Sequence, residues 1–178
     1  MLGLVLAGAV VAGVLLTTHH DPSPSAGSNN ARLTGRQVAS ATPFMLRGRP
    51  DDPEGLPFLF DRNPATAWHT DQYRNAAFGN LYPGLGVSIQ LSASGTVHHL
   101  LVNSPTPGWA AQTYVSSSPI ASGQPVSAWG KPTDTKTGIS GSATFDLAGR
   151  RGQWILLWLT HLSANPPFQV SINEITIT

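Results

Sequence analysis

Oxygen-bearing side chains gather in the segment FDRNPATAWHTDQY, and their spacing suits a hard cation. Asp61, Asn63 and Thr66 supply oxygen atoms at every second or third position of a short turn. A loop can wrap such oxygens around calcium, with backbone carbonyls completing the coordination. Without an ion, the same residues predict an Asx-turn capped by Thr66. Both interpretations are compatible with these residues.

Aromatic and arginine side chains form a second group with recognisable chemistry. Tyr73, Arg74 and Tyr82 fall in the longest predicted loop, and Trp109 follows a Pro-Thr-Pro-Gly turn. Aromatic rings can stack on the apolar faces of sugars while arginine donates hydrogen bonds. We therefore expect these four residues to bind a ligand. The alternatives are an ordinary solvated loop and, for Trp109, a cover over one end of the fold.

Catalytic patterns are absent from the sequence. It has no G-x-S-x-G, H-E-x-x-H, phosphate-binding loop or Rossmann glycine pattern. The 178 residues include no cysteine, which excludes disulfides, thiolate zinc sites and thiol catalysis. The net charge of +1 and the lack of a basic block argue against nucleic acid as a partner. We expect a binding module and not an enzyme, with an unrecognised hydrolase as a remote alternative.

The chain divides into three parts by composition. Residues Leu2–Leu16 are an uninterrupted apolar run, which predicts a single transmembrane anchor over residues 1–18, at the short end of what spans a bilayer. Whether Met1 is the native start stays open. Residues 19–35 are rich in Pro, Ser and Asn, and predict a flexible tether. Residues 36–178 remain for the folded domain.

The folded part has the composition of a β protein. Only 11% of the residues are charged, and 18 glycines and 15 prolines supply turns. Short apolar runs between turn signals predict an antiparallel sandwich or barrel with strands near Gly86–Leu91, Thr96–Asn103, Gln112–Ser117, Ala143–Leu147, Gln153–Thr160 and Phe168–Thr178.

Two of these strands carry further detail. The run Trp154–Leu159 is apolar at both alternating positions, so this strand is expected to be central and covered on both faces. In the last strand, Glu174 shares the parity of Phe168, Val170 and Ile172. A carboxylate pointing inward must be paired, hydrogen-bonded or bound to metal, unless a β-bulge turns Glu174 outward.

Two segments together resemble a known family. The first is DPEG followed by FDRNPATAWHTDQY, FG and GLGV, and the second is GQWILLWLT followed by VSINEITI. They are similar to the discoidin, or coagulation-factor C-type, domains of the galactose-binding-like superfamily. Within it they look most like the actinobacterial version attached to membrane-anchored Ser/Thr kinases and to the mycobacterial homologue of the lipid II flippase MviN. The resemblance covers nearly all of residues 36–178.

The resemblance implies an all-β, eight-stranded jelly-roll sandwich that binds a glycan, a lipid or a protein through loops at one end. It also implies that Asp61, Asn63, Thr66 and Glu174 hold a structural calcium. Asn63 stands where relatives commonly have Asp, which lowers the charge of the site.

These expectations combine into one functional hypothesis. The chain is expected to be a single-pass protein of the cell membrane whose C-terminal domain lies outside it and recognises a cell-wall glycan of the peptidoglycan type. The alternative is a docking domain that binds a membrane-protein partner in a cell-wall synthesis or kinase complex.

Overall fold

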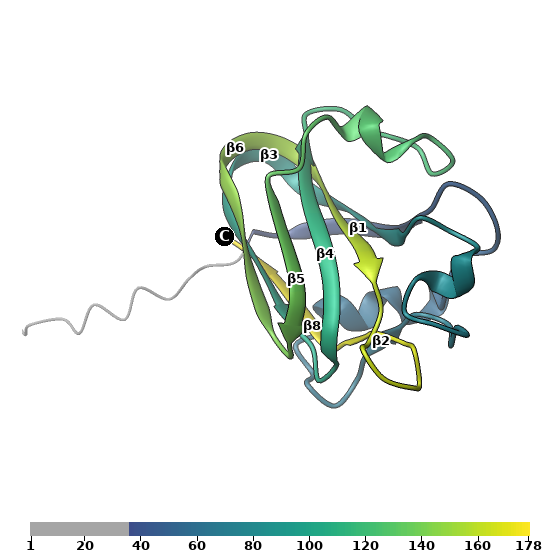
Figure 1. Cartoon of the computed structure of the whole chain (residues 1–178). Coiled ribbons are helices and arrows are strands. Elements are labelled where there is room, and N and C mark those ends of the chain that lie inside the picture. The colour runs from purple at the N-terminus through teal and green to yellow at the C-terminus, as the bar shows by residue number, and fades with distance from the viewer. Residues whose placement is uncertain (1–35) are drawn as a thin grey trace, which may run out of the picture. The chain divides into compact units, whose positions relative to one another are not determined.

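The computed structural model describes residues 36–178, most of whose regular structure is β-strand (Figure 1). The predicted anchor, residues 1–18, and the predicted tether, residues 19–35, lie outside the described residues. Within the described part, no helix has the length and apolar character needed to cross a bilayer.

Eight strands and three short 3-10 helices make up residues 36–178. The strands are β1 (Val38–Phe44), β2 (Trp68–His69), β3 (Leu85–Asn103), β4 (Pro107–Ser116), β5 (Asp134–Ser140), β6 (Ala143–His161), β7 (Ser171–Ile172) and β8 (Glu174–Ile177). The helices are η1 (Pro53–Phe60), η2 (Phe78–Asn80) and η3 (Val126–Trp129). The structure thus confirms the predicted antiparallel β fold, since all six strand pairings are antiparallel.

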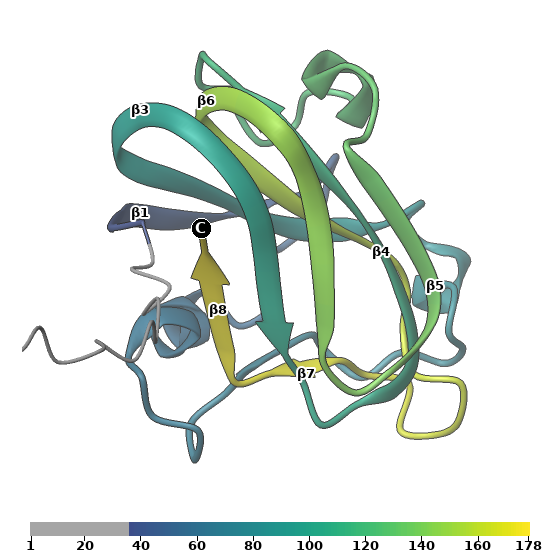
Figure 2. The same ribbon diagram turned by 90° about the vertical axis from the view of Figure 1, so that its left-hand side faces the viewer.

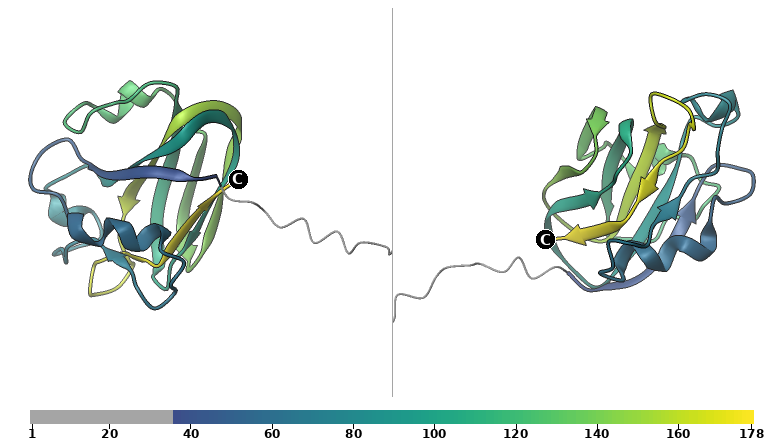
Figure 3. Two further views of the ribbon diagram at one scale, coloured as in Figure 1. Left: turned by 180° about the vertical axis from the view of Figure 1, so that it is seen from behind. Right: turned by 90° about the horizontal axis from the view of Figure 1, so that it is seen from below.

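Two long strands organise the sandwich. The main sheet has the order β1-β3-β6-β4-β5, β8 pairs with β3, and β2 and β7 form a separate small sheet. Four predicted strands merge into two, because β3 and β6 run on through the expected turns and curve strongly instead (Figure 2). The pairing register of β3 with β6 slips between Gln90 and Gly95, at this bend. Helix η1 lies against β1 and β8 (Figure 3).

The apolar run in β6 explains its central place. Ile155, Leu157 and Leu159 point into the main core, which also contains the fully buried Trp68. Leu156 and Trp158 point to the opposite face, where they pack with Phe44, Tyr114 and Trp129. Because the loop that carries η3 contributes Trp129, both faces of β6 are covered, which confirms the prediction of a central strand.

The last strand of the prediction is broken in the structure. It divides into β7, which pairs with β2, and β8, which pairs with β3. Ile172 is buried before the break and Ile175 after it, so the inward parity shifts at Asn173 and Glu174. The interruption leaves the Glu174 side chain half-buried at the edge of the core, and not inside it.

Candidate functional site

Three of the four predicted ligand-binding residues lie in one loop region. The Tyr73 and Tyr82 rings meet edge to face, with centroids 6.4 Å apart, and Phe78 from η2 meets Tyr73 in the same way at 5.6 Å. Both tyrosines are half-buried and pack on the main core. Arg74, next to Tyr73, is exposed.

A buried carboxylate, that of Asp51, holds Tyr73 in place. The Tyr73 hydroxyl donates to Asp51, with both carboxylate oxygens 3.0 Å away, and the Asp71 backbone N–H donates to the same carboxylate at 2.8 Å. Burial raises the pKa of Asp51, while these two hydrogen bonds oppose the shift. Burial and the neighbouring Asp51 charge raise the pKa of Tyr73, so its phenol stays protonated and continues to donate.

The segment Arg47-Gly48-Arg49 completes the region, and the sequence analysis did not find it. Arg47 donates to the Leu81 carbonyl oxygen at 3.0 Å, which ties this segment to the Tyr82 loop. Gly48 has a φ of +94°, and a Cβ atom there would lie 2.5 Å from the Tyr82 hydroxyl oxygen. A glycine between two arginines was the only local signal of this close approach.

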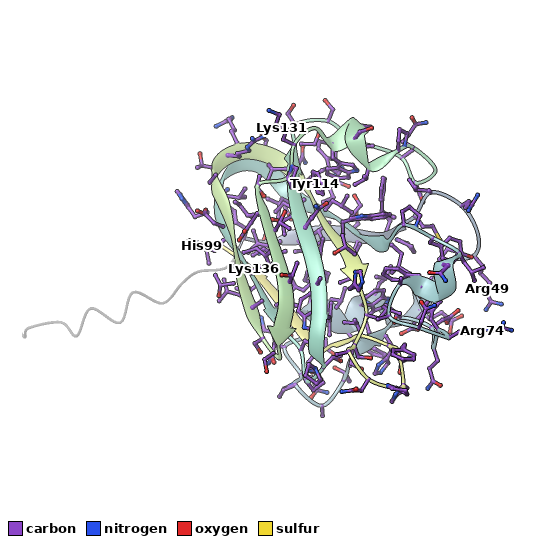
Figure 4. All side chains as sticks on the ribbon, in the orientation of Figure 1. Arg49, Arg74, His99, Tyr114, Lys131 and Lys136 are labelled. Atoms are coloured by element: carbon purple, nitrogen blue, oxygen red, sulfur yellow. The ribbon has the colours of Figure 1, made fainter. Side chains whose placement is uncertain are left out.

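Arg47, Arg49, Tyr73, Arg74 and Tyr82 are called the tyrosine–arginine site below. All three arginines are exposed, and Figure 4 shows Arg49 and Arg74 extending outward at the same edge of the molecule. None of them forms an ion pair: within residues 36–178 the one salt bridge joins Lys136 to Asp134. The arrangement therefore presents two half-buried tyrosines beside exposed guanidinium groups that have no ion-pair partner.

The prediction for Trp109 is wrong. Its side chain is 0% exposed, its ring packs beside Phe145, and its indole N–H donates to the Gly141 carbonyl oxygen at 3.1 Å. The Pro-Thr-Pro-Gly segment does not end in an open turn, because β4 already begins at Pro107 and directs the ring inward. Trp109 is a core residue and presents no face to a ligand.

The predicted metal ligands lie in a compact acidic turn, Asp61–Thr66. Asp61 accepts from the Asn63 backbone N–H at 2.8 Å and from the Thr66 hydroxyl at 2.7 Å. The Asn63 side-chain oxygen accepts from the Ala65 backbone N–H at 3.1 Å. These bonds are those of an Asx-turn, in which Thr66 holds the turn closed.

Glu174 reaches the same turn from β8. It accepts from the Arg62 backbone N–H at 2.8 Å. Burial raises the pKa of Glu174, and the nearby negative charge of Asp61 raises it further. A cation would relieve this repulsion, and the donors are all oxygen atoms, as calcium requires. Residues 36–178 contain no cluster of three or more His, Asp or Glu side chains fit to hold a metal. Calcium at this turn stays a prediction.

An open pocket of about 390 Å³ lies away from the tyrosine–arginine site. It covers the outer face of neighbouring strands β3, β6 and β8, and its lining residues are Leu101, Val102, Asn103, Ser142, Ala143, Thr144, Glu174 and Thr176. Its floor is shallow strand surface, and Ser142 and Asn103 satisfy each other by a hydrogen bond of 3.1 Å. The pocket places one side of Glu174 next to solvent.

Comparison with solved structures identifies the fold. The CBM32 domain of AlyQ, solved with 4,5-unsaturated mannuronic acid, matches with a TM-score of 0.55 and 14% identity, over 81% of this chain and 97% of that one. A pectin-binding carbohydrate-binding module matches with a TM-score of 0.55 and 14% identity, over 80% and 91%. A CBM32 module from Clostridium perfringens matches with a TM-score of 0.53 and 12% identity, over 79% and 94%.

Residues 36–178 therefore have the β-sandwich fold of these carbohydrate-binding modules. No family model matches the sequence. No curated protein matches it either. The resemblance to the actinobacterial membrane-attached branch stays a prediction.

Proposed function

We propose that this chain is a non-catalytic carbohydrate-binding protein that recognises a cell-envelope glycan through the tyrosine–arginine site. One observation carries the proposal: on a fold shared with modules solved as carbohydrate binders, adjoining loops bring together two half-buried tyrosines and three exposed arginines that form no ion pair. This is the combination that glycan recognition needs, because rings cover apolar sugar faces and guanidinium groups bond hydroxyls.

The proposed binding is weak for a single site. Both tyrosines offer only part of their rings, so a sugar buries little apolar surface there. A polar ligand on a shallow surface gives up water for each hydrogen bond it gains, and we expect a Kd of about 1 mM. Several anchored copies on one membrane would raise the total avidity.

The proposed target is a wall glycan of the peptidoglycan type, met outside the membrane. This part of the proposal is supported by the apolar run Leu2–Leu16 and by the polar segment that follows it. An anchor and a tether of that kind would hold the domain within reach of the envelope, and the chain would sample many sugar units at once.

A pull-down on purified cell wall tests the proposal. The wild-type chain should sediment with the wall, and Arg74→Ala/Tyr82→Ala should remain in the supernatant. Tyr73 is left intact, since its hydrogen bonds to Asp51 make it a structural residue as well. The matched control is Arg150→Ala, an exposed arginine in the bend of β6, which should bind as the wild type does. Equal sedimentation of a folded double variant would exclude this site.

One observation favours a second candidate, docking to a membrane protein. The Leu81 backbone carbonyl accepts the hydrogen bond from Arg47, and the Leu81 residue is 57% exposed. Such exposure is unusual for a large apolar side chain. A protein partner could cover Leu81 as well as the arginines. Capture of a partner protein by the wild-type chain, lost in Leu81→Ser and unaffected by glycan, would favour docking.

A further inference from the structure

We infer that the glycan bound at the tyrosine–arginine site carries an oxyanion, a carboxylate or a phosphate on the sugar, and that Arg49 and Arg74 select it. This inference rests on the proposed function and adds the class of ligand. It is carried by the lack of ion-pair partners for these arginines and by the way the loops hold them in place.

The arginines of the site have no ion-pair partner. Arg47, Arg49 and Arg74 are all exposed and form no ion pair with any described residue. Of the carboxylates nearby, Asp51 is buried and already accepts from Tyr73 and from the Asp71 backbone.

The remaining carboxylates are not paired with these arginines either. Asp52 accepts from the backbone N–H groups of Gly55 and His69, and so belongs to the start of η1. Glu54 and Asp71 are exposed, and neither is within ion-pair distance of an arginine of the site. The three guanidinium groups therefore have no carboxylate partner among the described residues.

The arginines start from loops that are fixed to one another. Arg49 lies two residues before Asp51, and Arg74 directly follows Tyr73, whose hydroxyl is bonded to Asp51. The same hydrogen bond therefore holds the backbones from which Arg49 and Arg74 extend. Arg47 and Gly48 add a second tie through Leu81 and Tyr82.

Guanidinium groups prefer oxyanions to hydroxyls. The planar fork matches a carboxylate or a phosphate with two parallel hydrogen bonds, and charge makes each bond stronger than a neutral one. The tyrosine edges cannot distinguish a charged sugar from a neutral one. Discrimination must then come from the arginines, and it should weaken as salt screens the charges.

Matched polymers test the ligand class with the full-length chain. Polygalacturonate and its fully methyl-esterified form share one backbone and differ in charge, and phosphomannan and mannan do the same for phosphate. We expect at least one charged polymer to bind about tenfold more tightly than its neutral partner, with the difference reduced at high salt. The pair that shows it identifies carboxylate or phosphate.

Matched variants assign the effect to this site. Arg49→Gln/Arg74→Gln should lose the preference, while Arg150→Gln/Arg151→Gln removes the same charge from the β6 bend and should keep it. Equal affinity of the wild type for charged and neutral polymers would overturn the inference and leave the proposed function standing. A preference that survives in Arg49→Gln/Arg74→Gln would overturn it too, and binding to no glycan would overturn both.

Discussion

The hydroxyl and the ring of Tyr73 make different contacts. Its hydroxyl contacts both oxygens of Asp51, and its ring stands between Phe78 and Tyr82. The hydroxyl therefore stabilises the loops, and the role that we propose for the half-buried ring is contact with a ligand. A substitution that removes only the hydroxyl can measure the first role alone.

Tyr73→Phe should keep the packing and lose the hydrogen bond. Asp51 would retain the Asp71 backbone donor, but a buried carboxylate would have lost one partner. We expect the free energy of unfolding to fall by about 1.5–3 kcal/mol, the usual value for a hydrogen bond to a charged group. Urea denaturation measures it. Tyr82→Phe is the control, because no hydrogen bond of the Tyr82 hydroxyl is found, and it should change stability by less than about 0.5 kcal/mol. Equal losses in both variants would contradict this account.

The raised pKa values of Tyr73 and Tyr114 predict how stability depends on alkaline pH. Burial raises the pKa of both phenols above the ordinary value of 10.0. Above that pH the folded chain holds more protons than the unfolded chain, so stability is complete below pH 10.0 and falls as pH rises beyond it.

Phenolate absorbance can follow the ionisation of the tyrosines directly, because the chain has only three of them. We expect two of them to ionise late, together with unfolding, and Tyr73→Phe to remove one of the two late phenols. Early and reversible ionisation of all three tyrosines in the folded chain would show that Tyr73 and Tyr114 are not shielded.

At the scale of elements, the acidic turn and β8 form a unit that an ion could lock. Asp61 and Glu174 approach each other, and burial and mutual repulsion raise the pKa of Glu174. If calcium binds between them, it stabilises the folded state by mass action, by about 2.7 kcal/mol when its concentration is a hundred times Kd. We therefore expect calcium to raise the melting temperature and a chelator to lower it.

Glu174→Gln should abolish that calcium dependence. Glutamine keeps an oxygen that can accept from the Arg62 backbone N–H, so the ion-free turn should survive. Melting curves of both proteins, with calcium and with chelator, decide the matter. Superimposable curves for the wild type in the two buffers would favour the ion-free Asx-turn. In that turn, the hydrogen bonds that Asp61 accepts hold the backbone in place without an ion.

The elements that the sequence predicted are those with strong apolar signals. The run in β6 could be recognised as central because burial on both faces leaves no polar alternation. Strand β5 was missed because it is an edge strand in which only Ile139 is buried. Strand β1, built largely of small and polar residues, was missed because its pairing with β3 comes from tertiary contact.

The candidate site was likewise only partly predictable. That Tyr73, Arg74 and Tyr82 lie near one another could be predicted because they share one loop in the sequence, and their role in binding stays a prediction. Arg47 and Arg49 could not, since only folding brings their segment against Tyr82. Trp109 was misplaced because side-chain direction depends on strand register, which a turn motif does not determine.

At the scale of the whole molecule, binding strength depends on how copies of the domain are displayed. Residues 36–178 form a unit with its own core. We propose that the segment before it anchors the chain in the membrane, so that weak single sites act together on a polymeric ligand. Residue 25 lies in the predicted tether, and the chain contains no cysteine, so one introduced thiol reports on one position.

Ser25→Cys and Thr137→Cys should both react with a membrane-impermeant thiol reagent on intact cells that express the chain. Thr137 is exposed on the edge strand β5, so it reports on the domain as Ser25 reports on the tether. An external domain predicts labelling of both cysteines before lysis, in protein that sediments with the membranes. The same two variants lacking residues 2–18 should leave the membrane fraction and should be labelled only after lysis. If the full-length variants are labelled only after lysis as well, the domain lies inside the cell, and an envelope glycan is not its ligand.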